Sequence, residues 1–246
     1  MSDEKSLKYN EPWILQRADP YVYRHTDGSY YFTASVPAYD GIVLRRAGTL
    51  AELSGAEEVM VWKKHESGPM SYHIWAPEIH YLFGKWYIYF AGGEAEDIWK
   101  IRPYVLECSG DDPLTDEWVE LGKMKRAAED EFSFEAFSLD ATVFENKGEY
   151  YYVWAEKVGV GKMISNLYIA KMESGNQLKT VQVLLTTPDY DWERKGFWVN
   201  EGPAVIHHDG KMFLTYSASE TGVDYCVGML SIDEDADILD PRLWKK

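Results

Sequence analysis

The sequence predicts an all-β protein of the β-propeller type, and two observations lead to this fold. The first is a repeat that occurs four times, and each copy runs from an acid through a short apolar strand and a polar turn to an aromatic-rich strand. The turn glycines are roughly 60 residues apart, at Gly28, Gly84, Gly148 and Gly210. The second is the length of the unit, which has room for the several strands of a propeller blade.

The four repeats occupy residues 19–35, 77–93, 139–156 and 201–219. The glycine in each turn tolerates a positive φ, which tight hairpins require. A run of strand-forming residues follows each turn, at 30–32, 86–90, 150–154 and 212–216. Runs that are apolar throughout indicate strands buried on both faces, as in blades packed on their neighbours. Four ordinary hairpins of a sandwich or meander are the alternative, but that fold does not explain the recurring acid.

The acids are the most informative part of the repeat. They stand at or near its start, at Asp19, Glu78, Asp140 and Glu201. Because the first strand of each propeller blade lines the central axis, acids at the starts of these strands should converge at one mouth of the channel. Converging carboxylates are the catalytic groups of glycosidases.

Composition and charge narrow the class of protein. The chain has 246 residues and no linker-like segment, so we expect residues 1–246 to form one domain. No apolar stretch is long enough to span a membrane. The net charge of −16 repels nucleic acids and anionic membrane surfaces, whereas a neutral oligosaccharide is a compatible partner. The 10 Trp and 18 Tyr residues could stack on sugars, although packing between blades accounts for most of them.

The two cysteines and the N-terminal sequence predict where the protein acts. Cys108 and Cys226 are far apart, and two cysteines do not make a disulfide framework, so both are expected to be free thiols. The first residues are charged and polar, unlike a secretory signal. We therefore expect a cytoplasmic protein, or a secreted one from which a signal peptide has been removed.

The motifs around the acids resemble those of glycoside hydrolase family 43 across nearly the whole chain. They are Ala18-Asp19-Pro20, Trp75-Ala76-Pro77-Glu78, Ser138-Leu139-Asp140-Ala141 and Asn200-Glu201-Gly202-Pro203. The resemblance implies a five-bladed propeller and an inverting glycosidase. It also implies that Asp19 is the base, Glu201 the acid, and Asp140 the group that raises the pKa of the acid and orients it.

Four further residues are candidate substrate-binding groups. Trp75 and Trp198 lie close to the acid motifs in sequence, so their rings could stack on a sugar, and His73 could bond a sugar hydroxyl. Glu78 occupies the acid position of its own repeat and is expected to have a mainly structural role. No cluster of His and Cys indicates a metal site, and no cofactor motif is present.

The sequence departs from the resemblance in one respect, because four repeats leave no room for a fifth blade. A fragment, a partner chain that completes the propeller, and closure by residues 1–18 would each account for this. Because an open blade edge favours association, we expect a homo-oligomer or a partner chain.

Two classes of function stay open at this stage. The first is a glycosidase that releases a pentose, most simply α-L-arabinofuranose, with β-xylosidase as the alternative. The second is a sugar-binding propeller without catalytic activity. The retention of Asp19, Asp140 and Glu201 favours an enzyme, since a binding module needs neither a base nor an acid.

Overall fold

The computed structural model describes residues 12–160 and 162–246, and this part of the chain is built almost entirely from antiparallel strands. The first four strands form one sheet in sequence order: β1 (Ala18–Arg24), β2 (Tyr30–Ser35), β3 (Gly41–Ala47) and β4 (Val59–Lys63). The next four form a second sheet: β5 (Tyr72–Leu82), β6 (Lys85–Glu94), β7 (Asp97–Cys108) and β8 (Val119–Lys123). We call these sheets blades I and II.

The remaining strands form two further units. Blade III contains β9 (Ser138–Asn146), β10 (Glu149–Val160), β11 (Lys162–Ser174), β12 (Gln177–Leu178) and β13 (Val183–Thr186). Blade IV contains β14 (Trp198–His208), β15 (Lys211–Ala218) and β16 (Cys226–Asp233). A short parallel pairing of β11 with β14 joins blades III and IV into one hydrogen-bonded sheet. Three short 3-10 helices lie between or after the strands: η1 (Leu50–Gly55), η2 (Asp191–Glu193) and η3 (Pro241–Leu243).

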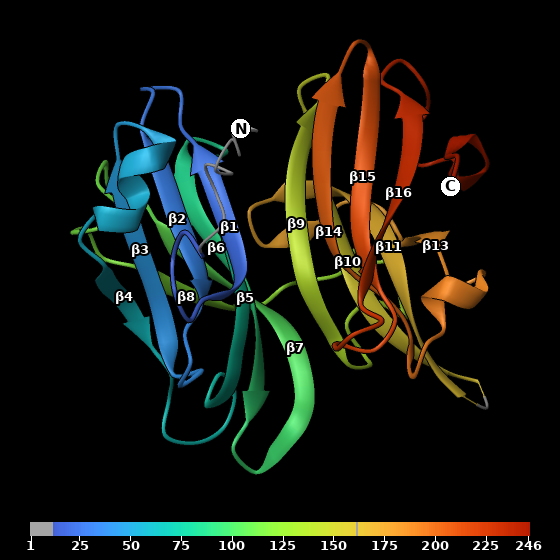
Figure 1. Cartoon of the computed structure of the whole chain (residues 1–246), viewed down its shortest axis with the longest axis horizontal. Coiled ribbons are helices and arrows are strands. Elements are labelled where there is room, and N and C mark those ends of the chain that lie inside the picture. Colours follow the sequence, from blue (N-terminus) through green and yellow to red (C-terminus); the bar gives the residue numbers. More distant parts are fainter. Residues whose placement is uncertain (1–11, 161) are drawn as a thin grey trace, which may run out of the picture.

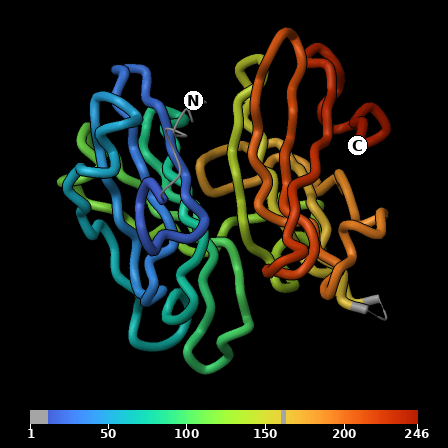
Figure 2. Tube along the Cα trace, in the orientation of Figure 1, coloured from blue at the N-terminus to red at the C-terminus, as the bar shows by residue number. Residues whose placement is uncertain are grey.

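The blades are arranged around an axis, as the repeat predicted. Blades I and II form one half of the molecule and blades III and IV the other (Figure 1). The trace in Figure 2 shows the same two halves facing each other, blue to green on one side and yellow to red on the other. The first strands of the blades contact one another in sequence: β1 contacts β5, β5 contacts β9, and β9 contacts β14. The prediction of an all-β propeller with four repeats is confirmed.

The aromatic runs of β6 and β10 are buried on both faces because blades II and III each pack on two neighbouring blades. In β6, Trp86 and Ile88 lie in a core shared with blade I, whereas Tyr87 and Tyr89 face a second core shared with blade III. In β10 the faces divide in the same way: Tyr152 and Trp154 pack toward blade II, and Val153 packs toward blade IV. Successive strand residues point to opposite faces, so a continuous apolar run fills two cores at once.

A β-bulge recurs at one place in the first strand of every blade. In each case two residues of the first strand stand opposite one residue of the second, between Ala18 and Tyr21, Trp75 and Glu78, Leu139 and Thr142, and Glu201 and Ala204. The first residue of each bulge has a left-handed backbone, with φ of 49° at Asp19, 45° at Ala76, 52° at Asp140 and 57° at Gly202. A bulge bends the strand and redirects its side chains. The same device therefore aims one residue of each blade at the axis.

This register corrects the assignment of Glu78 to the acid position. Asp19 and Asp140 are equivalent residues, but Ala76 takes that place in blade II and Glu78 lies two residues later. In blade IV the equivalent residue is Gly202, and Glu201 precedes it by one. The acids of the four repeats thus have three different positions relative to the bulge: its first residue in blades I and III, the residue after it in blade II, and the residue before it in blade IV.

The bulge in blade IV gives a test of this backbone geometry. Replacing Gly202 by Ala places a side chain on a left-handed backbone, which costs about 1–2 kcal/mol for an L-residue. The added methyl group makes no severe clash, because its nearest atom would be the Ser217 Oγ at 3.4 Å. We expect chemical denaturation to show that loss of unfolding free energy. Gly55→Ala is the control, since its Cβ would meet open space and its φ is not positive. Equal stability of the two variants would contradict the interpretation.

Candidate active site

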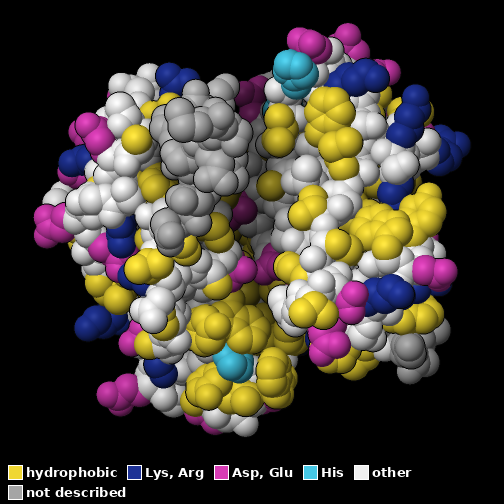
Figure 3. Space-filling model, in the orientation of Figure 1, with side chains coloured by type: hydrophobic (Ala, Val, Ile, Leu, Met, Phe, Trp, Pro, Cys, Tyr) yellow, Lys and Arg dark blue, Asp and Glu magenta, His cyan; other side chains and the backbone are white. Residues whose placement is uncertain are grey.

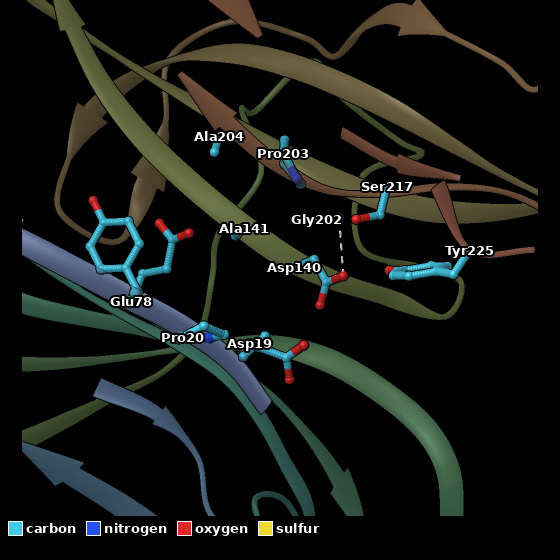
Figure 4. A pocket seen from close by; sticks show the side chains of 12 residues that line it. Asp19, Pro20, Glu78, Asp140, Ala141, Gly202, Pro203, Ala204, Ser217 and Tyr225 are labelled. Atoms are coloured by element: carbon cyan, nitrogen blue, oxygen red, sulfur yellow. Dashed lines mark hydrogen bonds between the residues drawn. The ribbon is translucent and has the colours of Figure 1, made fainter. Parts of the chain in front are cut away.

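Asp19, Asp140 and Glu201 come from three different blades and line one cavity of about 450 Å³. Figure 3 shows acidic side chains in the hollow between the two halves of the molecule. A neighbouring cavity of about 400 Å³ shares Asp19 and Asp140 with the first. In Figure 4 the carboxyl groups of Asp19 and Asp140 approach the same space from β1 and β9. The convergence expected of these three acids is therefore present.

The Asp19 carboxylate is connected to blade II through Ser35 on β2. The Ser35 hydroxyl donates a hydrogen bond of 2.7 Å to Asp19 Oδ2, and the backbone N–H of Ala76 donates one of 2.7 Å to Ser35 Oγ. Ser35 is 2% exposed, whereas Asp19 itself is exposed to the cavity. One side chain thus satisfies the N–H at the bulge of blade II and fixes the Asp19 carboxylate through Oδ2, and no other hydrogen bond from the described residues reaches that carboxylate.

Asp140 is held by the fourth blade in a similar way. Its Oδ2 accepts a hydrogen bond of 3.1 Å from the backbone N–H of Gly202, drawn as the dashed line in Figure 4. In both cases the N–H of a bulge residue is bonded by a side chain of the preceding blade. The bulges therefore shape the first strands and also connect the carboxyl groups to neighbouring blades.

Glu201 has two partners that sequence reasoning did not find. The Tyr225 hydroxyl, just before β16, donates a hydrogen bond of 2.9 Å to Glu201 Oε1. The ammonium group of Lys157 on β10 also lines the cavity, and its Nζ lies 3.8 Å from the centre of the Phe137 ring. Lys157 follows Glu156 directly after the apolar and aromatic run of residues 150–155, and this change to charged residues was a signal in the sequence. Tyr225 lies beside a short turn and carried no such signal.

The environment raises the pKa of two of the acids. Burial raises the pKa of Asp140 well above its ordinary value, and the negative charges of Glu201 and Asp19 raise it further. Burial also raises the pKa of Glu201, an effect that the Tyr225 hydrogen bond opposes, that Asp19 reinforces and that Lys157 opposes. Carboxyl groups in such surroundings retain a proton at higher pH than free ones. The site therefore contains groups suited to donate a proton.

Aromatic side chains form one rim of the cavity. Trp75, Trp99, Tyr39 and Phe197 all line it, and Trp99 and Phe197 are 61% and 63% exposed. A patch of hydrophobic side chains at one edge of the hollow is visible in Figure 3. Exposed aromatic faces of this kind are suited to stacking on sugar rings. Trp75, which the sequence analysis named as a substrate-binding candidate, lines the cavity, and the other three rings were not singled out from the sequence.

The other candidates lie around the cavity rather than in it. His73 lines a separate pocket of about 130 Å³, and its ring packs against Trp75 with 4.2 Å between centroids. Trp198 packs under the guanidinium of Arg194, 4.6 Å from the ring centre, and lines neither of the two acid cavities. Glu78 lines the neighbouring cavity, pairs with His80 at 2.9 Å, and has a pKa raised by burial.

Three carboxyl groups converging between the blades of a propeller define a class of protein, the propeller glycoside hydrolases. The chain belongs to glycosyl hydrolase family 43, whose family model matches residues 9–246.

Several characterised proteins are similar to this chain. Two are named extracellular exo-α-(1→5)-L-arabinofuranosidase, and each is 48% identical. The one from Streptomyces chartreusis aligns with 97% of this chain and 71% of its own length, and the one from Streptomyces avermitilis with 98% and 49%. A crystal structure of α-L-arabinofuranosidase from Lactobacillus brevis superposes with a TM-score of 0.87 at 52% identity, over 96% of this chain and 74% of that one. The chain thus spans between half and three quarters of these relatives.

The structure and the comparisons also bear on the expectations about membranes, metal ions, cysteines and location. No helix in the described part of the chain is long and apolar enough to cross a membrane. The described residues also contain no group of three or more His, Cys, Asp or Glu placed to hold a metal ion. Both cysteines are free. Because the two Streptomyces relatives are named as extracellular, a cytoplasmic location is not supported.

The raised pKa of Asp140 predicts a cost to stability. The folded protein holds the Asp140 proton more tightly than the unfolded chain does. The contribution of Asp140 to the free energy of unfolding therefore falls as the pH rises, and it is lowest above the raised pKa of Asp140. Asp140→Asn removes the buried charge while an amide oxygen can still accept from Gly202. We therefore expect the variant to be more stable than the parent at pH 7, by about 1 kcal/mol or more.

The same substitution should lose its advantage in acid. Below the ordinary value of 3.8 the carboxyl group is protonated in both states, so the two proteins should converge in thermal unfolding temperature near pH 3 to 4. Glu66→Gln, at an exposed acid between β4 and β5, is the control and should change little at any pH. An Asn variant that is no more stable than the parent at pH 7 would rule out this account.

Proposed function

We propose that this chain is an inverting α-L-arabinofuranosidase that removes terminal arabinofuranose from arabinan- or hemicellulose-derived oligosaccharides. The observation that carries the chemistry is the meeting of Asp19, Asp140 and Glu201 in one cavity. The names of relatives at 48% to 52% identity support the choice of arabinofuranose. We also propose that the enzyme acts outside the cell, as the names of two relatives state for those proteins.

The proposed reaction is a single displacement. Glu201 gives its proton to the glycosidic oxygen as the bond from that oxygen to the anomeric carbon breaks. Asp19 takes a proton from a water molecule whose oxygen attacks the anomeric carbon from the opposite face, so the configuration inverts. Glu201 ends deprotonated and Asp19 protonated, and exchange with solvent restores both groups.

Each acid has surroundings that suit its proposed role. The acid must hold a proton at the working pH, and burial together with the charge of Asp19 raises the pKa of Glu201. The base must present a free oxygen to water, and Ser35 holds only Oδ2 of the exposed Asp19 carboxylate. Asp140 lines the same cavity as the other two acids and accepts a hydrogen bond from the backbone of Gly202, the residue after Glu201. We assign it the role of orienting the acid and raising its pKa.

The shape of the cavity supports a small sugar. A volume of about 450 Å³ with an aromatic rim fits a pentose with part of its leaving group. β-Xylosidase activity is the alternative for the same chemistry, and a sugar-binding propeller is the alternative without chemistry. The pairing of a hydrogen-bonded base with a protonated acid favours an enzyme.

The first experiment measures hydrolysis of α-1,5-arabinobiose, p-nitrophenyl α-L-arabinofuranoside and the corresponding β-xyloside. We expect activity on the two arabinosides and little on the xyloside. Asp19→Asn should abolish turnover of every substrate, because every leaving group needs the attacking water. Glu201→Gln should cost the disaccharide more than the aryl arabinoside, since an activated leaving group needs less protonation, and general acid catalysis contributes about 10²–10⁴-fold.

An equal loss of hydrolysis rate on both arabinosides in Glu201→Gln would contradict the assignment of Glu201 as the acid. Circular dichroism and thermal unfolding of each variant show whether the fold survives. A parent protein that binds arabino-oligosaccharides but hydrolyses none would favour the sugar-binding alternative.

We further propose that one face of blade IV is covered by another chain. Ile206 on β14 and Val227 and Met229 on β16 are 56%, 72% and 50% exposed, and the two strands flank β15 in the sheet. An apolar sheet face of this kind favours association. Light scattering at micromolar concentration should therefore show a species larger than 28.4 kDa, and Val227→Asp with Met229→Asp should restore the monomer. A parent protein that is already monomeric would exclude self-association through this face.

A further inference from the structure

Blade IV carries Tyr225, a residue that contacts the proposed acid Glu201. Neither the family motifs nor the names of the relatives assign a role to Tyr225. We infer that Tyr225 is a positioning residue that holds Glu201 by one oxygen and so determines which oxygen carries the proton to the leaving group. This inference rests on the proposed function of Glu201 as the acid. It is carried by one contact, the 2.9 Å hydrogen bond from the Tyr225 hydroxyl to Glu201 Oε1.

The position of Tyr225 is fixed by the strands on both sides of it. The loop of residues 219–225 connects β15 to β16, and the Tyr225 N–H bonds the Gly222 carbonyl at 3.2 Å within it. The next residue, Cys226, pairs with Ala218 as β16 begins. Tyr225 lines both cavities, and Figure 4 shows its ring approaching Asp140 from the side of blade IV. A short loop anchored at both ends holds the phenol where it can reach the acid.

The neighbouring strand places a second hydroxyl beside the phenol. Ser217 on β15 is the cross-strand partner of Glu201, and it lines the same cavity as Tyr225. Burial and the negative charge of Glu201 raise the pKa of the phenol, so it stays protonated and acts as a donor. Ser217 and Tyr225 thus both lie beside Glu201 on blade IV, and Tyr225 makes the hydrogen bond to it.

The hydrogen bond has a stereochemical consequence. Oε1 accepts the O–H of Tyr225, so the proton of a neutral Glu201 resides on Oε2. A proton on Oε2 can be given only to an atom on that side of the carboxyl group. Tyr225 therefore restricts the acid to one direction of proton transfer, which is the geometric condition for general acid catalysis.

The hydrogen bond also has an electrostatic consequence. A donor to the carboxylate stabilises the charged form and lowers the pKa of Glu201. The other groups that act on Glu201 are Asp19 from β1, Asp140 from β9, and Lys157 from β10, and Glu220 lies in the same loop as Tyr225. Removing only the phenolic oxygen leaves these groups in place, so the shift in pKa reports the single contact.

The test is Tyr225→Phe in the full chain. We expect turnover of α-1,5-arabinobiose to fall about 10-fold or more with little change in KM, because hydrogen bonds to charged groups are worth about 1.5–3 kcal/mol. The aryl arabinoside should lose less. The alkaline limb of the pH profile should move to higher pH, since the acid holds its proton more tightly without the donor.

Tyr81→Phe is the matched control. Both tyrosine residues are 38% exposed, and Tyr81 on β5 lines neither acid cavity. This variant should keep the turnover, the leaving-group dependence and the pH profile of the parent. Thermal unfolding of both variants shows whether either change disturbs the fold.

A measurement that needs no activity separates this inference from the proposed function. Titration of ¹³C-labelled glutamate carboxyl groups by NMR, with Glu201→Gln to identify the signal, gives the pKa of Glu201 directly. A higher pKa in Tyr225→Phe supports the contact, even if the parent hydrolyses none of the substrates tested. An unchanged pKa, or an equal loss of both arabinosides in an active enzyme, would overturn it.

Discussion

The left-handed residue in each first-strand bulge is the constraint on which the site depends. A regular strand would alternate its side chains between the two packed faces of the blade and send none toward the axis. The bulge breaks this alternation at one position and redirects Asp19 and Asp140 into the cavity. Non-glycine residues rarely adopt a positive φ, and strained backbone of this kind is concentrated at functional sites. Here Asp19 and Asp140, two of the three residues whose carboxyl groups line the cavity, have this backbone.

The bulges also explain how the carboxyl groups are fixed. A bulge leaves an N–H without its ladder partner, and a buried N–H without a partner is costly. Ser35 bonds the N–H of Ala76 and also Asp19, and Asp140 bonds the N–H of Gly202. The same hydrogen bonds that satisfy the backbone thus orient the acids. Packing between the blades holds this arrangement rigid, because the aromatic runs of β6 and β10 each fill two cores.

Placing three acids in one cavity opposes folding and at the same time enables chemistry. Burial and mutual repulsion raise the pKa values of Asp140 and Glu201. A surface that only binds neutral sugars does not require this loss of stability. Tyr225 and Lys157 each moderate it from a different blade, so the proton affinity of Glu201 is a balance among groups far apart in the chain.

The sequence by itself determined the propeller class, its four repeats and the three acids. The turn glycines, the aromatic runs and the recurring acids are local signals, and local signals survive without knowledge of the contacts between blades. Prolines after Asp19, Ala76 and Gly202 also mark three of the four bulges. Only the tertiary structure decided that Glu78 lies two residues from the acid position, that His73 lines a separate pocket, and that Tyr225 bonds Glu201. The physical reason is register: which residue of a strand faces the axis depends on its pairing with the next strand, and which loop reaches an acid depends on how blades pack.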